Sequence, residues 1–238
     1  MPTAVVTGAN RGMGLEFTRQ LLESGHHVFA TARGKKADAL DALGRAHPDQ
    51  LTRLSLDVGD TGSIATFAAE LTTRTDHVDL LVNNAGINSR TMPKGQKNVR
   101  FGDLEPEGLQ RMVAVNAIGP VLLVQALLPL LQASQTAKVV SVSSWLASIG
   151  NKSSGGNYGY CASKTMLNML ARMMAFDLKP HGITSVVINP GWVQTDMGGD
   201  QAPLTAETSV AGMLSVAAGL GIDDAGRFMV WDGTEQPW

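Results

Sequence analysis

The sequence predicts an α/β protein in which a sheet of about seven mostly parallel strands is covered by helices on both faces. Two observations lead to this prediction. Short apolar runs alternate with longer segments of helical spacing, and the runs are continuously apolar instead of alternating apolar with polar residues. Strands of that kind are buried on both faces of a sheet. No linker, composition break or internal repeat divides the 238 residues, so we expect one domain spanning residues 1–238.

Seven runs that are rich in β-branched residues and bounded mainly by Gly, Asn, Asp or Ser predict the strands. In chain order they are Val5–Thr7, Val28–Thr31, Leu54–Leu56, Leu80–Val82, Val139–Val142, Ser185–Ile188 and Arg227–Val230.

Helices are predicted where apolar residues recur every three or four positions. They follow the first strand (Leu15, Leu21, Leu22), the third (Ile64, Phe67, Ala68, Leu71) and the fifth (Met166, Leu167, Leu170, Met173, Met174). Asp60 precedes the second of these helices, where its carboxylate can cap the first turn. Two loops remain: Asn88–Gly102 is expected on the surface, and Gly150–Gly156 is expected to be mobile.

Charge and composition exclude several classes of partner. With 19 Lys and Arg against 21 Asp and Glu, the net charge is −2, and no basic field for nucleic acid is present. The single cysteine, Cys161, excludes an internal disulfide and is typical of a reducing compartment. The N-terminus lacks the pattern of a signal peptide, and the longest apolar stretch, Ile118–Leu131, is too short for a membrane span. The five histidines show no metal-ligand spacing. We therefore expect a soluble cytoplasmic protein without a metal, nucleic-acid or membrane partner.

A glycine-rich turn connects the first strand with the following helix. Its residues are Thr7-Gly8-Ala9-Asn10-Arg11-Gly12-Met13-Gly14. Such a turn lets backbone N–H groups approach a diphosphate, and the helix N-terminus adds a favourable dipole. A glycine-rich turn without a ligand is the alternative, because short glycine patterns also occur by chance. The glycine spacing differs from the usual dinucleotide pattern Gly-x-Gly-x2-Gly.

This spacing is that of the cofactor turn in the short-chain dehydrogenase/reductase family, and further marks of the family follow in order. They are Asp57-Val58, Asn83-Asn84-Ala85-Gly86, Asn116, Ser143-Ser144, Tyr160-x3-Lys164 and Pro190-Gly191-Trp192-Val193-Gln194-Thr195. The sequence therefore resembles this family over nearly its whole length. The ending Phe228–Trp238 is similar to that of a single-domain branch containing C-factor and sniffer-like carbonyl reductases. The resemblance implies a Rossmann-like doubly wound sheet with the active site at the carboxyl ends of the strands.

The end of the second strand favours NADP(H) over NAD(H). A carboxylate there would bind a ribose 2′-hydroxyl and repel a 2′-phosphate, but the strand ends in Thr31-Ala32-Arg33. Arg33 can form a bidentate pair with a phosphate, and Arg11 adds a second charge in the glycine turn. Two solvated surface arginines are the alternative. The resemblance implies a cofactor site composed of Gly8, Asn10, Arg11, Gly12, Met13, Gly14, Arg33, Asp57, Val58, Asn84, Ala85, Gly86, Tyr160, Lys164, Pro190, Gly191, Val193 and Thr195.

Tyr160 and Lys164 lie four residues apart, and hence on one face of a helix. Hydride transfer to a carbonyl leaves an alkoxide that must receive a proton, and a tyrosine ordinarily has a pKa of about 10. A nearby ammonium and the positive ring of an oxidised nicotinamide would favour the phenolate and lower that pKa. A partly buried packing tyrosine at a helix start is the alternative for Tyr160. Tyr158 has no lysine four residues later and is expected in the pocket or in packing.

The resemblance implies the other catalytic roles. Ser144 would hydrogen-bond the substrate oxygen, with Ser143 as the alternative hydroxyl. Lys164 would also hold the nicotinamide ribose, and Asn116 would support Lys164 through a water. An apolar substrate pocket is expected from Leu146, Tyr158, Trp192 and Met197.

The predicted function is the reversible reduction of a ketone or aldehyde to an alcohol by NADPH, so the partner is a small carbonyl or alcohol substrate. One alternative is an NADP(H)-binding signalling or regulatory protein of the C-factor type with little turnover. Another is an epimerase or dehydratase that keeps its nucleotide tightly bound. A homodimer or homotetramer is expected from the apolar helices around Val113–Leu131 and Tyr160–Leu178.

Overall fold

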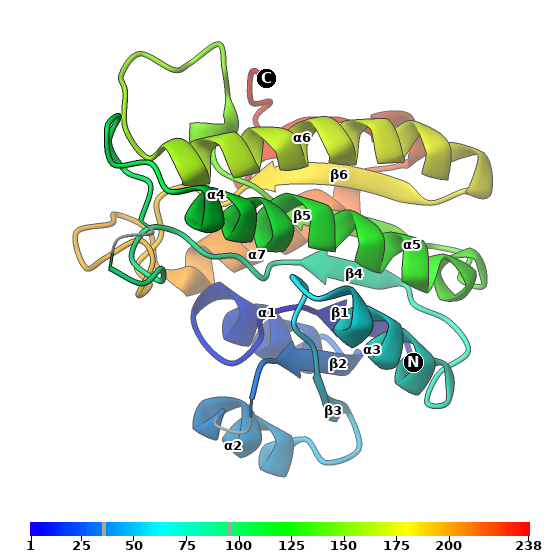
Figure 1. The fold of residues 1–238 in the computed structure, drawn as a ribbon. Coiled ribbons are helices and arrows are strands. Elements are labelled where there is room, and N and C mark those ends of the chain that lie inside the picture. Colours follow the sequence, from blue (N-terminus) through cyan, green and yellow to red (C-terminus); the bar gives the residue numbers. More distant parts are fainter. Residues whose placement is uncertain (35–36, 95–96) are drawn as a thin grey trace.

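A seven-stranded parallel sheet forms the centre of the molecule (Figure 1). The computed structural model describes residues 1–34, 37–94 and 97–238. The strand order is β3-β2-β1-β4-β5-β6-β7, and every pair of neighbours is parallel, which confirms the predicted fold class. The strands are β1 (Thr3–Val6), β2 (His27–Ala32), β3 (Leu51–Ser55), β4 (Leu80–Asn83), β5 (Lys138–Val142), β6 (Thr184–Asn189) and β7 (Phe228–Val230).

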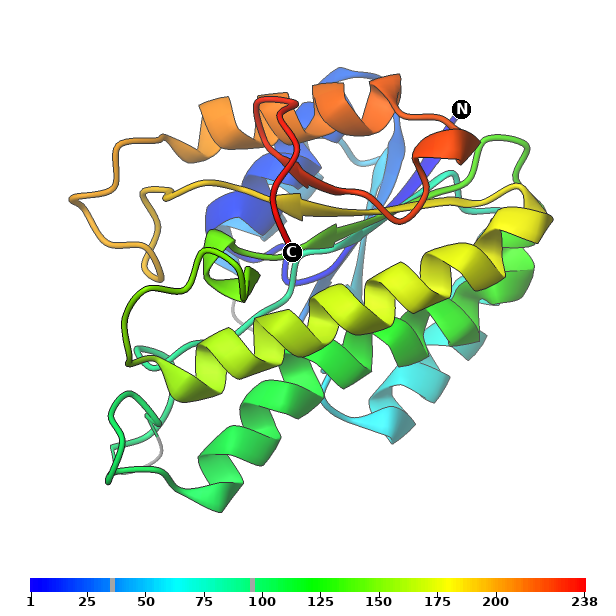
Figure 2. The same cartoon turned by 90° about the horizontal axis from the view of Figure 1, so that it is seen from above.

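Helices cover the two faces of the sheet as two separate layers (Figure 2). One layer contains α1 (Gly12–Glu23), α2 (Asp38–Ala46) and α7 (Ala206–Gly219). The other contains α3 (Thr61–Thr72), α4 (Pro106–Val113), α5 (Gly119–Gln132) and α6 (Tyr158–Leu178). The chain goes from β1 outward to β3 and then returns to the other side of β1 at β4. Ligands in such sheets bind at this reversal point, beyond the carboxyl ends of the strands.

The predicted elements are confirmed, with boundaries that move by one to three residues. Thr7 and Leu56 lie just beyond β1 and β3, where the backbone leaves the ladder. Asp60 caps α3 by accepting a hydrogen bond from the Ser63 N–H at 2.6 Å. Helices α2 and α7 were not predicted, and Leu40 is the only buried residue of α2. A helix that buries so little apolar surface leaves almost no periodicity in the sequence.

The apolar helix that ends at Gln132 is longer than the sequence analysis expected. Helices α4 and α5 are joined through a π-helical segment, η1 (Ala114–Ile118), into one helix over Pro106–Gln132 with a mean hydropathy of 2.0 in its most apolar window. By length and composition it could cross a membrane, so the expectation of a stretch too short to do so is wrong. Half of that window is buried, and the helix packs between α3 and α6 as a core helix of the domain.

A close backbone approach fixes where this helix crosses the sheet. A Cβ at Gly119 would lie 1.9 Å from the carbonyl oxygen of Val58, so only glycine fits there.

The two predicted loops differ in how far their residues are exposed to solvent. Gly150–Gly156 is exposed almost throughout, whereas Met92 and Asn98 in Asn88–Gly102 are buried. Residues 95–96 of that second loop lie outside the described residues.

Candidate active site

The glycine turn is shaped by its backbone conformation and by close contacts. Gly8 and Gly12 have φ values of +67° and +53°, in the left-handed region that favours glycine. A Cβ at Gly14 would lie 2.2 Å from the Gly8 carbonyl oxygen, and a Cβ at Gly8 would lie 3.0 Å from Ala85 Cα. The turn is therefore closed on itself and lies directly against the loop that follows β4.

The first turn of α1 keeps its backbone N–H groups available. Arg11 occupies the N-cap position, but no side chain caps the helix, and the first turn contains no acidic residue. Four N–H groups at a helix N-terminus have no partner within the helix. They and the helix dipole favour an anion, so the turn fits a diphosphate.

The loop after β4 is tied to the glycine turn by hydrogen bonds. The Thr7 hydroxyl accepts from the backbone N–H groups of Asn84 and Ala85, at 3.0 Å each. The Asn84 side-chain amide donates to the Thr7 carbonyl at 2.8 Å. These bonds connect the ends of β1 and β4, the two strands at which the sheet order reverses.

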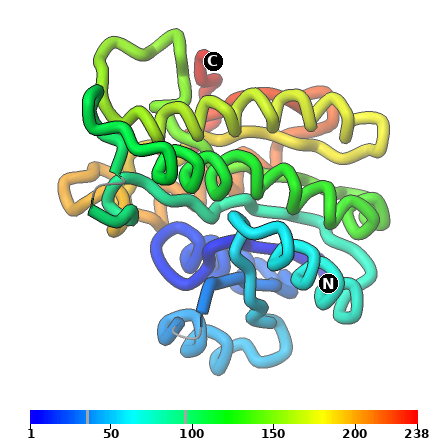
Figure 3. Tube along the Cα trace, viewed as in Figure 1, coloured from blue at the N-terminus to red at the C-terminus, as the bar shows by residue number. Residues whose placement is uncertain are grey.

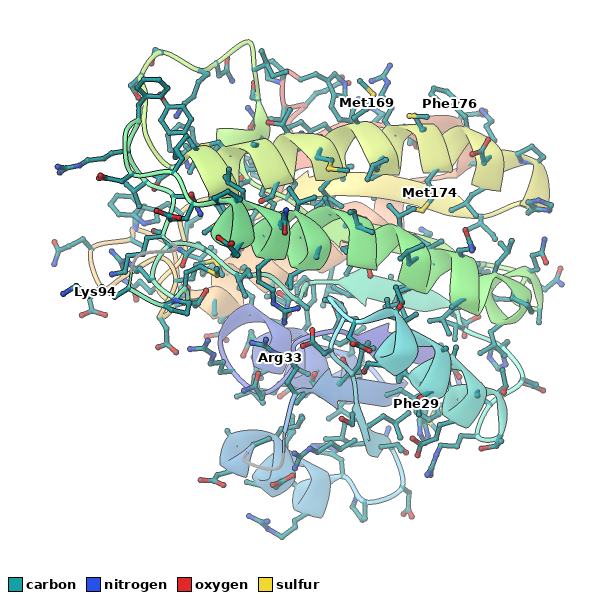
Figure 4. The ribbon with its side chains drawn as sticks, in the orientation of Figure 1. Phe29, Arg33, Lys94, Met169, Met174 and Phe176 are labelled. Atoms are coloured by element: carbon teal, nitrogen blue, oxygen red, sulfur yellow. The ribbon has the colours of Figure 1, made fainter. Side chains whose placement is uncertain are left out.

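The two arginines predicted to bind a 2′-phosphate both lie at this end of the sheet. Arg33 follows β2, is largely exposed, and its guanidinium is 3.9 Å from the Asp57 carboxylate (Figure 4). Arg111 on α4 binds the same carboxylate at 2.8 Å. Burial alone would raise the pKa of Asp57, but the Gly59 N–H and the two guanidinium groups outweigh it and lower that pKa. Arg11 pairs with Asp196 across the cleft.

Tyr160 and Lys164 lie on one face at the start of α6, as the spacing predicts. The Lys164 ammonium is buried and donates to the Val142 carbonyl at 2.7 Å. Burial lowers the pKa of Lys164 to about 8. Burial raises the pKa of Tyr160 to about 12, although a hydrogen bond with Ser144 opposes the change.

The lowering of the Tyr160 pKa that is expected from the Lys164 ammonium together with an oxidised nicotinamide stays a prediction, and the chain alone shows the opposite direction. Burial, which disfavours the phenolate, is the larger effect, and the ammonium is engaged with the end of β5. The raised pKa keeps the Tyr160 hydroxyl protonated at neutral pH.

The serine pair after β5 is divided between the core and the cleft. The Ser143 hydroxyl donates to the Asn168 side-chain oxygen at 2.6 Å and is buried. The Ser144 hydroxyl is hydrogen-bonded to Tyr160 and accepts from the Leu146 N–H at 3.2 Å. Ser144, not Ser143, thus presents its hydroxyl beside the tyrosine.

Asn116 lies in the π-helical segment η1, fully buried. Its side-chain oxygen accepts from the Ile87 N–H at 2.8 Å, and its amide donates to the Ile87 carbonyl at 2.8 Å and to Ser163 at 3.0 Å. A Cβ at Gly86 would lie 3.4 Å from Asn116 Oδ1 and 3.8 Å from Lys164 Nζ. Asn116 therefore holds the loop after β4 close to Lys164. Single-turn π segments are frequent at functional sites because they re-aim a side chain.

One cleft of about 1230 Å³ at the carboxyl ends of the strands joins these parts. It is lined by every residue of the predicted cofactor site, by Ser144, and by Leu146, Trp192 and Met197 of the predicted substrate pocket. Asn116 lies behind its wall. Tyr158 does not line the cleft either, because its ring faces Phe101 at 6.2 Å and is one-third exposed. The contact with Phe101 fits the other expectation for Tyr158, that of a packing residue.

The loop Pro190–Thr205 closes one side of the cleft. Trp192 is half exposed, and its indole N–H donates to the Gly198 carbonyl at 2.9 Å. A Cβ at Gly12 would lie 3.4 Å from the Thr195 methyl group, so the loop covers the glycine turn. In the part of the chain that the structure describes, no group of three His, Cys, Asp or Glu side chains could hold a metal ion.

The sequence analysis missed several residues of the cleft. Asn88 and Arg90 follow the Asn-Ala-Gly segment, and Trp145 follows Ser144 directly. Their position just beyond strand ends was a usable signal, because loops at the carboxyl ends of parallel strands form the site. Arg111 carried no such signal, since only the packing of α4 brings it to Asp57.

Comparison with known proteins identifies the family to which the chain belongs. The sequence model of the short chain dehydrogenase family matches residues 2–204, and the chain belongs to this family of oxidoreductases. The C-signal protein of Myxococcus xanthus is 42% identical over 164 residues, which are 69% of this chain and 95% of that protein.

Two solved structures are similar over the whole chain. The NADPH-bound carbonyl reductase from chicken fatty liver has a TM-score of 0.92 and 35% identity, covering 100% of this chain and 99% of the other. The carbonyl reductase Sniffer of D. melanogaster has a TM-score of 0.91 and 32% identity, covering both chains completely.

Proposed function

We propose that this protein reduces a ketone or aldehyde to an alcohol with NADPH, reversibly, and that Tyr160 is the proton donor. The observation that carries the proposal is the Ser144–Tyr160–Lys164 arrangement in the same cleft as the glycine turn. An anion-binding turn alone would fit a nucleotide-binding protein. A partly buried tyrosine hydroxyl beside a serine hydroxyl fits a carbonyl oxygen that gains negative charge.

The residues of the cleft fit NADP(H). Gly8, Gly12 and Gly14 with the first turn of α1 would hold the diphosphate, because no side chain occupies those N–H groups. Arg33 and Arg11 would hold the 2′-phosphate, since both guanidinium groups line the cleft. When bound, NADPH supplies the hydride.

Residues of the chain would then stabilise and neutralise the negative charge that develops on the carbonyl oxygen. Ser144 and Tyr160 would both donate to this oxygen, and their O–H groups stabilise negative charge best in a site with little water. With a pKa of about 12, Tyr160 would keep its proton until an alkoxide forms on the substrate and accepts it. Lys164, with a pKa of about 8, is mostly protonated at pH 7 and stabilises the phenolate after transfer. Asn116 would keep the loop after β4 in contact with Lys164.

The proposal is tested by following NADPH and NADH absorbance with a panel of aldehydes, aryl ketones and diketones. We expect faster oxidation of NADPH than of NADH, and loss of nearly all turnover in Tyr160→Phe while the variant still binds NADPH. Tyr158→Phe is the matched control, because it removes the same hydroxyl two residues away and outside the cleft. Equal activity of the two variants would contradict the role of Tyr160.

A signalling role is the second candidate, and the likeness to the C-signal protein is the observation that favours it. The same assay separates the two. If NADPH binds but no carbonyl is reduced, the regulatory function replaces the enzymatic one. Cofactor that copurifies and is not consumed would instead favour an epimerase or dehydratase.

We further propose a cytoplasmic homodimer or homotetramer. Helix α6 exposes the side chains of Met169, Met173 and Phe176, each more than half accessible. Figure 4 shows Met169 and Phe176 on the outer side of this helix. A second copy of the chain would bury this apolar stripe. Light scattering of the purified protein tests the assembly, and a monomeric mass would contradict it.

A further inference from the structure

The C-terminal segment Trp231–Trp238 folds back over the sheet and reaches both sides of the cleft. After β7 the chain reverses in a turn, in which the Asp232 carboxylate accepts from the Thr234 N–H at 3.0 Å and from its hydroxyl at 2.7 Å. It then runs antiparallel to β7, where the Gln236 N–H donates to the Phe228 carbonyl at 2.7 Å. Figure 3 shows the end of the chain beside the loop that follows β5, and Figure 2 shows the same neighbourhood from above.

Gln236 connects this segment with the cofactor side of the cleft. Its side chain is buried, and its oxygen accepts from the Asn189 amide at 3.0 Å. The Asn189 side-chain oxygen in turn accepts from the Gly191 N–H at 3.0 Å. Gly191 has a φ of +79°, and a Cβ there would lie 3.0 Å from the Trp231 ring. The segment thus packs against the backbone of Gly191 and is linked to it by hydrogen bonds through Asn189.

Trp238 connects the segment with the catalytic side. Its main-chain oxygen accepts from the Gly150 N–H at 3.1 Å and from the Ser148 hydroxyl at 3.3 Å. Its ring lies 5.2 Å from the Phe228 ring, and the Arg172 guanidinium lies over it at 4.8 Å. Ser148 and Gly150 end the short segment that begins at Ser144, so Trp238 holds the far end of that segment.

We propose that Trp231–Trp238 is a positioning element for the active site, with Trp238 acting on Ser144 through residues 148–150 and Gln236 acting on Gly191 through Asn189. The loops after β5 and after β6 are separate in sequence and line the same cleft. A single segment bonded to both loops keeps the serine hydroxyl and the cofactor loop in a fixed relation. This inference rests on the proposed reductase activity for its kinetic consequences only.

The test compares Trp238→Ala, Trp238→Phe and Gln236→Leu, with Glu235→Gln as a control in the same segment whose side chain is exposed. Hydrogen exchange is measured over residues 145–152 and 189–195, together with NADPH Kd and with kcat and KM for a carbonyl substrate. Trp238→Ala keeps the main-chain oxygen but removes the ring that anchors it against Phe228. For this variant we expect faster exchange in 145–152 and a loss of about tenfold in kcat/KM, equal to about 1.4 kcal/mol, with NADPH Kd unchanged. Trp238→Phe should recover most of this loss, because a phenyl ring can still pack on Phe228.

For Gln236→Leu we expect the complementary result, with faster exchange in 189–195 and an NADPH Kd raised about tenfold. This variant keeps the proposal testable if Trp238→Ala does not fold. A general loss of Tm with exchange raised everywhere, and with kcat/KM and Kd unchanged in the folded protein, would overturn it. The wild type could reduce no carbonyl while Trp238→Ala still raises exchange in 145–152 and Gln236→Leu still raises it in 189–195. That result would contradict the proposed reductase activity but would support Trp231–Trp238 as a positioning element.

Discussion

Replacing Lys164 by methionine should stabilise the protein at neutral pH while abolishing its activity. The ammonium of Lys164 is buried and donates one hydrogen bond, to Val142 at 2.7 Å, and none of the residues that the structure describes is recorded in an ion pair with it. A lowering of its pKa from 10.5 to about 8 corresponds to a cost of about 3 kcal/mol for the charged form. Methionine keeps most of the apolar length of the lysine side chain and removes that charge.

The sign of the effect follows from proton binding. Folding lowers the pKa of Lys164, so the folded protein binds this proton more weakly than the unfolded chain. The cost is fully present below pH 8, decreases as the pH rises from about 8 to 10.5, and is absent above that range. Loss of the hydrogen bond offsets about 1 kcal/mol. The expected net gain of Lys164→Met at pH 7 is therefore about 2 kcal/mol, or roughly 4 to 8 °C in Tm for a chain of this size.

The difference in stability is measured by urea and thermal unfolding of wild type and Lys164→Met. The measurements are made at intervals between pH 6.5 and 10. The advantage of the variant should shrink steadily above pH 8 and disappear or reverse by pH 10. Lys152→Met is a control for removing an exposed cation. Equal destabilisation of Lys164→Met at pH 7 and at pH 10 would refute the argument that the buried charge is costly.

Three further outcomes are expected. Arg33→Ala should raise the Kd of NADPH about 10- to 100-fold and leave that of NADH unchanged in a fluorescence titration, because a bond to a charged group contributes about 1.5–3 kcal/mol; equal losses for both cofactors would contradict a 2′-phosphate site. The kcat/KM of carbonyl reduction should fall above pH 8 as Lys164 loses its proton, while Tyr160, with a pKa of about 12, stays protonated; a flat profile to pH 10 would contradict this. Gly119→Ala should cost more than about 3 kcal/mol in urea unfolding, because its Cβ would meet the Val58 carbonyl at 1.9 Å. Gly219→Ala, which meets nothing within 4 Å, should stay within about 1 kcal/mol of wild type.

Most of the fold was predictable because its signals are local. A strand buried on both faces must be continuously apolar, and Val139–Val142 or Ser185–Ile188 are recognisable without knowing their neighbours. Helix α2 was missed because it buries one residue, and the length of the helix ending at Gln132 was underestimated because α4, with its polar face, continues into α5.

The sequence by itself determined the motifs that depend on short spacings. The glycine turn, Arg33 at a strand end, and Tyr160 with Lys164 four residues later are each defined within a few positions of the backbone. Strand ends of a parallel sheet meet at one edge, which is why the predicted cofactor residues line a single cleft.

Only the tertiary structure decided how those groups are surrounded. Packing pairs Ser143 with Asn168 and leaves Ser144 beside Tyr160, and it turns Tyr158 away from the cleft. It also buries Lys164 and partly buries Tyr160, so that desolvation is the main cause of the shift in both pKa values. Burial and contacts between distant segments depend on the whole packed arrangement, and no local pattern of residues encodes them.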